Sequence, residues 1–136
     1  MTAPATPSPP RRGRPLRVGL LAPEFPGCGP AYGVGTYLAT LSRALARAGA
    51  EVLVLACTGD GCFVADDPAS PHLRREPWGP AVLRPLSVSR WLTRQLRQFE
   101  ADVVEAPNWG GLSACLSGPW ARVVRLSTPV STVRSG

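Results

Sequence analysis

A short apolar segment, a glycine-rich loop and a segment with helical periodicity follow one another near the start of this 136-residue chain. Residues 16–22 read LRVGLLA, which is almost continuously apolar, as strands buried on both faces of a parallel sheet are. Residues 34–48 carry apolar side chains at three- and four-residue steps, which indicates one apolar helix face. Residues 51–57, EVLVLAC, form a second apolar segment. This order predicts a β-α-β unit whose glycine loop faces the N-terminus of the helix.

The remaining sequence continues the alternation of strands and helices. We expect a loop at 58–80, a short strand at 81–84, a helix from Ser87 or Ser89 to about Phe99, a strand at 102–106, a short helix at 112–116 and a last strand at 122–127. Such an order favours an α/β fold, a Rossmann-like open parallel sheet with helices on both faces. The 58–80 loop is long enough that it either has a function or contains an unrecognised element. We also expect apolar surface to stay exposed beside the last strand.

Composition excludes several classes of protein. Residues 1–15 are rich in Pro and Arg, lack the apolar region of a secretory signal and are expected to be disordered. No apolar run approaches the ~20 residues that cross a membrane. The four cysteines form no C-x-x-C pair, so zinc spacing is absent and a reducing, cytoplasmic setting is the simplest location. The net charge of +6 comes from arginine without lysine. A basic tail and solvated helix faces explain this charge better than binding to anionic lipid, nucleic acid or a phosphorylated substrate.

The glycine loop brings backbone N–H groups to the start of a helix, where the helix dipole favours an anion. The glycines of this loop are Gly27, Gly29, Gly33 and Gly35. The loop fits neither G-x-G-x-x-G nor G-x-x-x-x-G-K-[ST]. No acidic residue ends the second strand where a ribose would be bound, which disfavours a nicotinamide cofactor. A purely structural glycine turn is the alternative.

Polar and aromatic residues follow the strand expected at 102–106. Glu105, Asn108 and Trp109 lie where this strand meets its loop, and open α/β sheets bind ligands at the carboxyl ends of their strands. A sugar suits this set, because its hydroxyls bond to the polar groups while its ring stacks on the indole. Packing of Trp109 on the following helix is an equally weighted alternative. Glu24, which follows the first strand, is either a sugar ligand or a solvated acid.

Three arginines, Arg90, Arg94 and Arg97, line up on one side of the second expected helix. A stripe of this kind can lie on an anionic membrane surface. A solvated helix face is the favoured explanation. Peripheral membrane contact is kept as the alternative.

Four blocks of the sequence resemble the N-terminal half of family 4 glycosyltransferases of the GT-B fold. The blocks are LLAPEFP, GVGTYLATLSRALARAGAEVLVLA, DVVEAPNWGG and RVVRLSTP, in the order the family has them. The resemblance implies that residues 16–136 are part of a GT-B architecture, the N-terminal domain that mainly binds the acceptor. A second domain of such enzymes grips the nucleotide sugar. The resemblance also implies retention of anomeric configuration and no metal or other cofactor.

The resemblance assigns roles to individual residues. The glycine loop would approach the donor diphosphate through the backbone of Gly33, Val34 and Gly35. Contacts to the acceptor are implied for Glu24, Glu105, Asn108 and Trp109. Ser127 stands where many relatives have histidine, and it would lie near the transferred sugar, where serine can still form a hydrogen bond.

Three features separate this chain from a complete enzyme of that family. It contains no Glu-x7-Glu motif, and Ser127 replaces the histidine. Tyr32 precedes Gly33, where relatives often have a pair of glycines before the helix. We therefore expect transfer of a hexose-type sugar from a nucleotide sugar to an acceptor hydroxyl only together with a separate C-terminal half. The rival interpretations are a noncatalytic binding or regulatory remnant of the fold and, less favoured, a dinucleotide-binding oxidoreductase domain.

Overall fold

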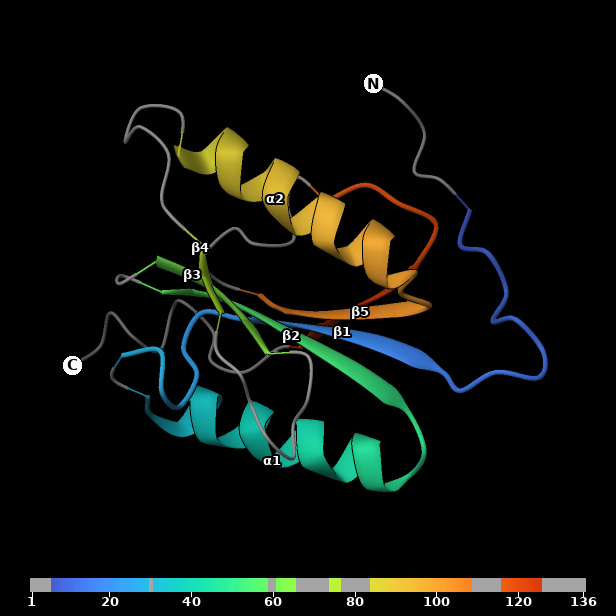
Figure 1. Cartoon of the computed structure of the whole chain (residues 1–136), viewed down its shortest axis with the longest axis horizontal. Coiled ribbons are helices and arrows are strands. Elements are labelled where there is room, and N and C mark those ends of the chain that lie inside the picture. Colours follow the sequence, from blue (N-terminus) through green and yellow to red (C-terminus); the bar gives the residue numbers. More distant parts are fainter. Residues whose placement is uncertain are drawn as a thin grey trace.

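The computed structural model describes residues 6–29, 31–58, 61–65, 74–76, 84–108 and 116–125. A six-stranded sheet lies between two helices, one on each face (Figure 1). The strands are β1 (Arg17–Ala22), β2 (Glu51–Thr58), β3 (Gly61–Ala65), β4 (Arg74–Glu76), β5 (Val103–Pro107) and β6 (Ala121–Arg125). The helices are α1 (Gly33–Arg47) and α2 (Arg84–Phe99).

The strand order is β4-β3-β2-β1-β5-β6. Strands β2, β1, β5 and β6 are parallel, which confirms the predicted Rossmann-like open sheet with a helix on each face. Strands β3 and β4 are antiparallel to their neighbours. They are the unrecognised element in the expected 58–80 loop, and they make the sheet mixed rather than wholly parallel. Both strands are too short to give a clear alternation of apolar and polar residues, and Gly, Asp and Pro flank them in the sequence.

Helix α1 begins and ends close to where the sequence indicates. Leu38 is 1% exposed, and together with Val34, Leu41 and Leu45 it packs on the face of the sheet that α1 covers. At the C-terminus, Gly49 has a φ of 94°, its N–H donates to the Ala46 carbonyl, and the Ala50 N–H donates to the Leu45 carbonyl. This is a Schellman motif, in which glycine takes the left-handed conformation without a Cβ penalty.

Helix α2 begins at Arg84, earlier than the expected Ser87 or Ser89. The strand expected at 81–84 is wrong at its last residue, and residues 81–83 lie outside the described part of the chain. Pro85 accounts for the early start, since proline needs no N–H partner in the first turn and its φ suits a helix. Trp91, Leu92 and Leu96 of α2 are buried on the opposite face of the sheet from α1.

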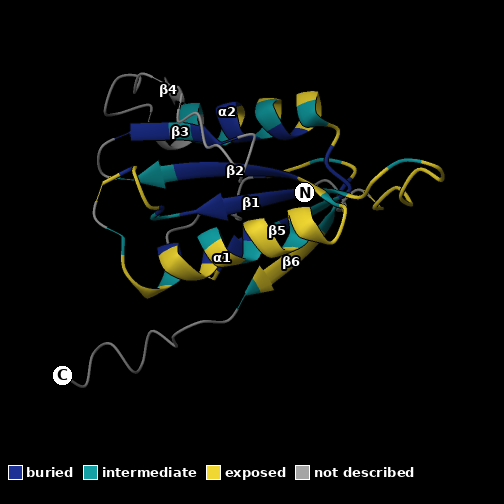
Figure 2. Cartoon of the chain, turned by 60° about the horizontal axis from the view of Figure 1, so that its bottom comes forward, coloured by how far each residue is buried: buried dark blue, intermediate teal, exposed yellow. Residues whose placement is uncertain are grey.

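The apolar core is divided by the sheet into an α1-side cluster and an α2-side cluster. Figure 2 shows β1 and β2 buried between them, whereas β6 is largely exposed. Val123 and Val124 of β6 are each 48% exposed, which is apolar surface of the kind expected beside the last strand. The described part of the predicted last strand ends at Arg125.

The amino ends of three parallel strands are joined through Asp102, which is 9% exposed. Its carboxylate accepts the Arg17 N–H at 2.9 Å and pairs with Arg14 at 2.9 Å, while its carbonyl accepts the Ala121 N–H at 2.9 Å. The N–H of Ser8 donates to the Pro119 carbonyl at 2.8 Å. The disorder expected for residues 1–15 stays a prediction.

Candidate functional site

The glycine loop connects the carboxyl end of β1 to the N-terminus of α1 (Figure 1). Two of its side chains, Phe25 and Cys28, are buried in the α1-side cluster, and the Cys28 N–H donates to the Phe25 carbonyl at 3.0 Å. Burial raises the pKa of the Cys28 thiol to about 11, so it stays protonated at neutral pH. Gly27 and Gly29 adopt φ values of 89° and 106°, which other residues avoid. The loop is therefore held in one shape by apolar anchors and a tight turn.

Glu24 caps helix α1 from the far side of the loop. Its Oε1 accepts the backbone N–H of Tyr32 at 3.0 Å and that of Gly35 at 2.8 Å. Tyr32 is the N-cap residue and has no capping side chain, so Glu24 supplies the acceptor that Ser or Asp usually provides. A carboxylate also suits the positive end of the helix dipole. The acceptor contact expected for Glu24 stays a prediction, and this capping role is one that the sequence did not indicate.

Two N–H groups at the start of α1 remain available. The Thr36 N–H bonds to the Tyr32 carbonyl at 3.0 Å, but no acceptor in the described part of the chain is bonded to the N–H of Gly33 or Val34. A Cβ added to Gly33 would meet nothing within 4 Å, so the space beside it is open. Unpaired donors at an accessible helix N-terminus are suited to binding an anion.

Gly35 lacks a side chain for a different reason. A Cβ added there would lie 3.0 Å from the Ala31 Cβ and 3.3 Å from the Cγ and the carbonyl oxygen of Glu24. The glycine therefore allows the capping carboxylate to approach the helix. Of the three predicted phosphate contacts, Gly33 and Val34 have N–H groups with no acceptor among the described residues, whereas the N–H of Gly35 is bonded to Glu24.

Glu105 lies in a charged cluster that crosses from β5 to β6 and α1. Its Oε1 is 3.8 Å from the Nε of Arg125, and the two side chains are 15% and 17% exposed. The Arg125 guanidinium carbon lies 4.6 Å from the centroid of the Tyr37 ring, a cation–π distance. Burial raises the pKa of Glu105, and the positive charge of Arg125 opposes that shift less strongly.

This cluster is incompletely hydrogen-bonded. Oε1 of Glu105 and both Nε and Nη2 of Arg125 are buried without a hydrogen-bond partner in the described structure. The sequence indicated Glu105 but not Arg125 or Tyr37. Their proximity depends on the pairing of Pro107 with Arg125 across β5 and β6, and no local pattern reveals that register.

The other predicted sugar-binding residues are placed only in part. Asn108 follows β5 and is exposed, and its N–H donates to the Arg125 carbonyl at 3.1 Å. Glu105 and Asn108 are thus both beside Arg125 at the end of β6. Trp109 and Ser127 lie outside the described residues, so their roles stay predictions.

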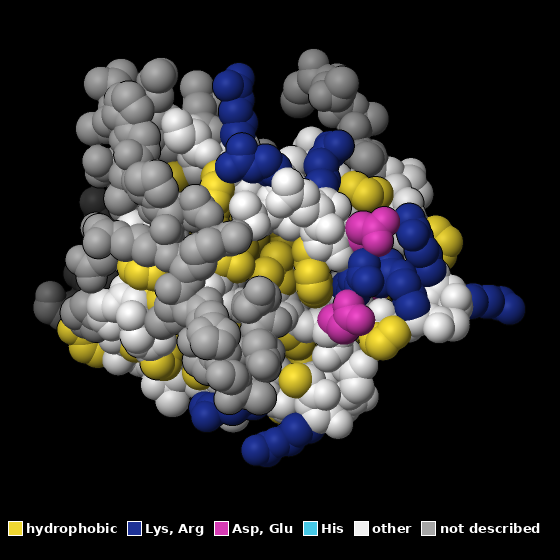
Figure 3. Space-filling view, in the orientation of Figure 1, with side chains coloured by type: hydrophobic (Ala, Val, Ile, Leu, Met, Phe, Trp, Pro, Cys, Tyr) yellow, Lys and Arg dark blue, Asp and Glu magenta, His cyan; other side chains and the backbone are white. Residues whose placement is uncertain are grey.

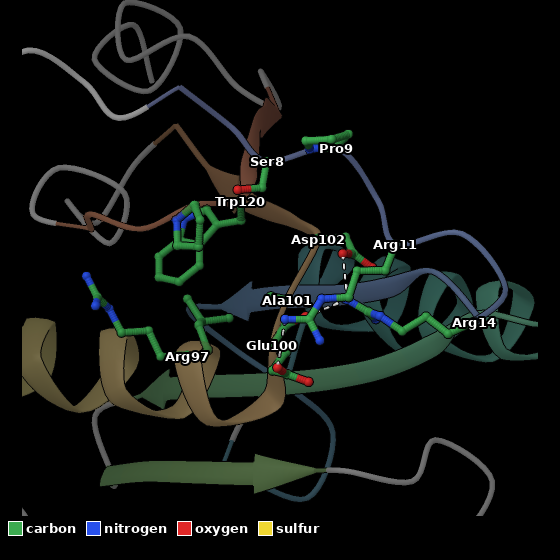
Figure 4. A pocket seen from close by; sticks show the side chains of 11 residues that line it. Ser8, Pro9, Arg11, Arg14, Arg97, Glu100, Ala101, Asp102 and Trp120 are labelled. Atoms are coloured by element: carbon green, nitrogen blue, oxygen red, sulfur yellow. Dashed lines mark hydrogen bonds and ion pairs between the residues drawn. The ribbon is translucent and has the colours of Figure 1, made fainter.

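A pocket of about 300 Å³ lies at the opposite edge of the sheet, where the parallel strands begin (Figure 4). Its lining includes Arg11, Arg14, Glu100, Asp102 and Trp120. Arg14 is bonded to Asp102, and Arg11 pairs with Glu100 at 3.2 Å, so these charges are largely neutralised within the protein. Because the pocket lies where the parallel strands begin, it is remote from their carboxyl ends, where the described site residues lie.

Basic side chains are visible over α2 in the space-filling view (Figure 3). Arg90, Arg94 and Arg97 of this helix are all exposed, as expected of a solvated face. Arg97 donates a hydrogen bond to the Ser117 carbonyl at 3.4 Å. Among the helices that the structure describes, none has the length and apolar character needed to cross a bilayer.

Comparison with known proteins gives one match. The family model described as Glycosyltransferase Family 4 matches residues 31–133. Searches of curated proteins and of solved structures found no match. The matched region contains the N-terminus of α1, the Glu105–Arg125 cluster and the described part of α2.

Proposed function

Because the chain belongs to glycosyltransferase family 4, we propose that it is the acceptor-side domain of an enzyme that transfers a hexose-type sugar. The donor is a nucleotide sugar, and the acceptor is a hydroxyl group. Family membership supports a sugar donor and an acceptor as the substrates. The observation that carries the proposal is the N-terminus of α1, where the N–H groups of Gly33 and Val34 have no acceptor among the described residues and the space beside Gly33 is open.

The donor diphosphate binds at these two N–H groups in the proposed complex. Charge accumulates on the diphosphate as the bond to the sugar breaks, and fixed backbone dipoles stabilise that charge without reorganising. The Glu24 carboxylate, which is bonded to the N–H of Gly35, repels a diphosphate at this end of the helix. A diphosphate must therefore approach from the open side of Gly33. Glu24→Gln, which removes the charge and keeps a carbonyl oxygen for capping, is expected to bind diphosphates more tightly.

The acceptor lies beside the carboxyl ends of β5 and β6 in this proposal. Glu105 and Asn108 supply polar contacts there, and Arg125 and Tyr37 extend the same surface. Glu24 is a further proposed acceptor contact through its second carboxylate oxygen. We propose that Trp109 stacks on the sugar acceptor and that Ser127 lies near the transferred sugar. The Trp109 assignment is supported by its position after β5 and by the family motif, and the Ser127 assignment by the family motif.

A complementary half that grips the nucleotide is part of the proposal. Catalysis with retention, without a metal and in the cytoplasm, is proposed for the assembled enzyme. The second candidate function is a noncatalytic binding or regulatory module, favoured by Ser127 in place of the family's histidine. Contact with an anionic membrane surface through the exposed arginines of α2 is compatible with either function.

Titration with nucleotide sugars tests the donor site. Uridine and guanosine diphosphate sugars are added to the ¹⁵N-labelled chain, and the amide resonances of Gly33, Val34 and Gly49 are followed. The first two should shift, whereas Gly49, at the other end of α1, serves as the internal reference. Free uridine lacks the diphosphate and should leave all three unchanged. Unmoved Gly33 and Val34 resonances, also in the presence of a complementary half, would contradict the donor site.

Sugar transfer on mixing with that half separates the two candidate functions. Product formation would exclude the noncatalytic module. If the nucleotide sugar shifts the amide resonances but no sugar is transferred, although the complementary half binds the donor, the noncatalytic module would be supported. Affinity for NAD or NADP would favour the oxidoreductase alternative.

A further inference from the structure

Two cysteines lie directly opposite each other on the hairpin formed by β2 and β3. The antiparallel register pairs Cys57 with Cys62, and their Sγ atoms are 3.4 Å apart in a thiol–thiol hydrogen bond. Cys62 is 5% exposed, and Cys57 is half-buried. Both side chains pack on the α2-side cluster, so they lie on the same face of the sheet. The two thiols are therefore held in contact by backbone pairing and by core packing.

We propose that Cys57 and Cys62 form a reversible cross-strand disulfide and are thus a modification site of this protein. Directly opposed residues of an antiparallel pair have Cα atoms about 4.5–5.5 Å apart, within the range that a disulfide spans. The Sγ atoms need to approach from 3.4 Å to about 2.05 Å. Rotation about the Cα–Cβ bonds supplies a displacement of that size, so the strand pairing need not be broken.

The oxidant in this proposal is a low-molecular-weight disulfide such as oxidised glutathione. The Cys57 thiol loses its proton and attacks one sulfur of glutathione disulfide, whose S–S bond breaks and releases one glutathione thiolate. The Cys62 thiol then loses its proton and attacks the Cys57 sulfur of the mixed disulfide, which releases the second glutathione. Two protein thiols are oxidised to one disulfide, and one glutathione disulfide is reduced to two thiols.

Accessibility decides which cysteine reacts first. Cys57 is more exposed than Cys62, so the first attack is assigned to Cys57. The hydrogen bond to Cys62 and burial both raise the pKa of Cys57, and the small thiolate fraction makes this attack slow. The second attack is fast in comparison, because the resolving thiol already lies beside the mixed disulfide.

The new bond would fix the hairpin at the carboxyl end of β2. Strand β2 lies beside β1, whose carboxyl end leads into the glycine loop. Only residues 58–61 separate the two cysteines, so the crosslink encloses a very short segment. We therefore expect a local effect on the β2–β3 hairpin and choose the bond itself as the readout.

The test equilibrates the folded 136-residue chain in buffers of increasing ratio of oxidised to reduced glutathione. Acid quenching, alkylation of remaining thiols and peptide mass mapping then locate each disulfide. We expect a peptide in which Cys57 is linked to Cys62, with loss of two hydrogens, and its reversal by dithiothreitol. Circular dichroism at each ratio reports that the chain stays folded.

Cys28→Ser is the matched control, because Cys28 is buried in the α1-side cluster, on the other face of the sheet from Cys57 and Cys62. This variant should form the Cys57–Cys62 bond at the same glutathione ratio as the unaltered chain. Cys57→Ser and Cys62→Ser should form no intramolecular bond between these positions, and Cys62→Ser should retain a glutathione adduct on Cys57. The proposal is overturned if the linked peptide stays absent from the folded chain at the most oxidising ratio. It is equally overturned if the link forms only in denaturant.

Discussion

The Glu24 carboxylate and the Gly35 N–H are joined by a hydrogen bond of 2.8 Å that caps part of the N-terminus of α1 from within the protein. Eleven positions of sequence separate the two residues, so the loop between them is held as a closed ring. The capped donors are those of Tyr32 and Gly35, and the Gly33 and Val34 donors are left without an acceptor in the described part of the chain. An internal anion thus determines which part of the helix N-terminus is open to an external one.

Replacement of Glu24 should separate capping from charge. Glu24→Ala leaves two helix N–H groups without their acceptor, and we expect a loss of about 1–2 kcal/mol in the free energy of unfolding. Glu24→Gln keeps an oxygen that can accept both hydrogen bonds and should cost less than half of that. Urea denaturation of the two variants measures the difference. Equal losses would show that the charge, rather than the hydrogen bonds, stabilises the loop.

The two glycines at the start of α1 should respond differently to alanine. Gly35→Ala places a Cβ 3.0 Å from the Ala31 Cβ, and the neighbouring backbone of Glu24 must move as well. We expect a loss of about 1–2 kcal/mol, because overpacking outweighs the gain in helix propensity.

Gly33→Ala is the matched control, since its Cβ meets nothing within 4 Å. Its stability should be unchanged or slightly higher, for alanine restricts the unfolded chain more than glycine does. Thermal unfolding of both variants compares them under one condition. A Gly33→Ala loss as large as that of Gly35→Ala would contradict the packing explanation.

Asp102 should be far more sensitive to substitution than an exposed acid with a similar ion pair. Asp102→Ala leaves the Arg14 guanidinium and the Arg17 N–H without their shared partner, and about 2–4 kcal/mol of stability should be lost. Glu51→Ala breaks the ion pair between Glu51 and Arg17, whose side chains are 45% and 26% exposed, respectively. This variant should lose under about 1 kcal/mol of stability. Urea denaturation at low and high salt measures both. Similar losses in the two variants would show that the burial of Asp102 has no effect.

The fold was largely predictable because its strongest signals are local. The apolar run of β1, the helical periodicity of α1 and the glycine at position 49 each act within a few residues, and all three predictions are confirmed. Strands β3 and β4 were not assigned because they are short and because their stability depends on pairing, of β3 with β2 and of β4 with β3. The start of α2 was misplaced because a strand was assigned where Pro85 favours a first helical turn.

The candidate site was less predictable, since its contacts cross elements that are distant in sequence. Gly33 and Val34 were indicated by the loop pattern, but the capping role of Glu24 needs the folded loop. Likewise, Arg125 meets Glu105 only through the parallel register of β5 and β6. A sequence pattern gives the residue types at a strand end, but it does not say which side chains neutralise each other.

Arg125 should control the protonation of Glu105. Burial raises the pKa of Glu105, and the nearby guanidinium partly opposes this shift, so Arg125→Gln should raise that pKa further. A raised pKa means that the folded protein holds the proton more tightly than the unfolded chain does. Stability should therefore fall as the pH rises from the ordinary glutamate value through the folded-state pKa of Glu105, and this fall should be larger in Arg125→Gln.

Carboxyl ¹³C resonances followed as a function of pH measure the pKa of Glu105 directly. Arg122→Gln is the control, because it removes the same charge from β6 at an exposed position that has no contact with Glu105 among the described ion pairs. That variant should leave the titration of Glu105 nearly unchanged. If the two variants shifted the pKa of Glu105 equally, the effect would come from net charge. If neither did so, the 3.8 Å approach of the two side chains would have no electrostatic consequence.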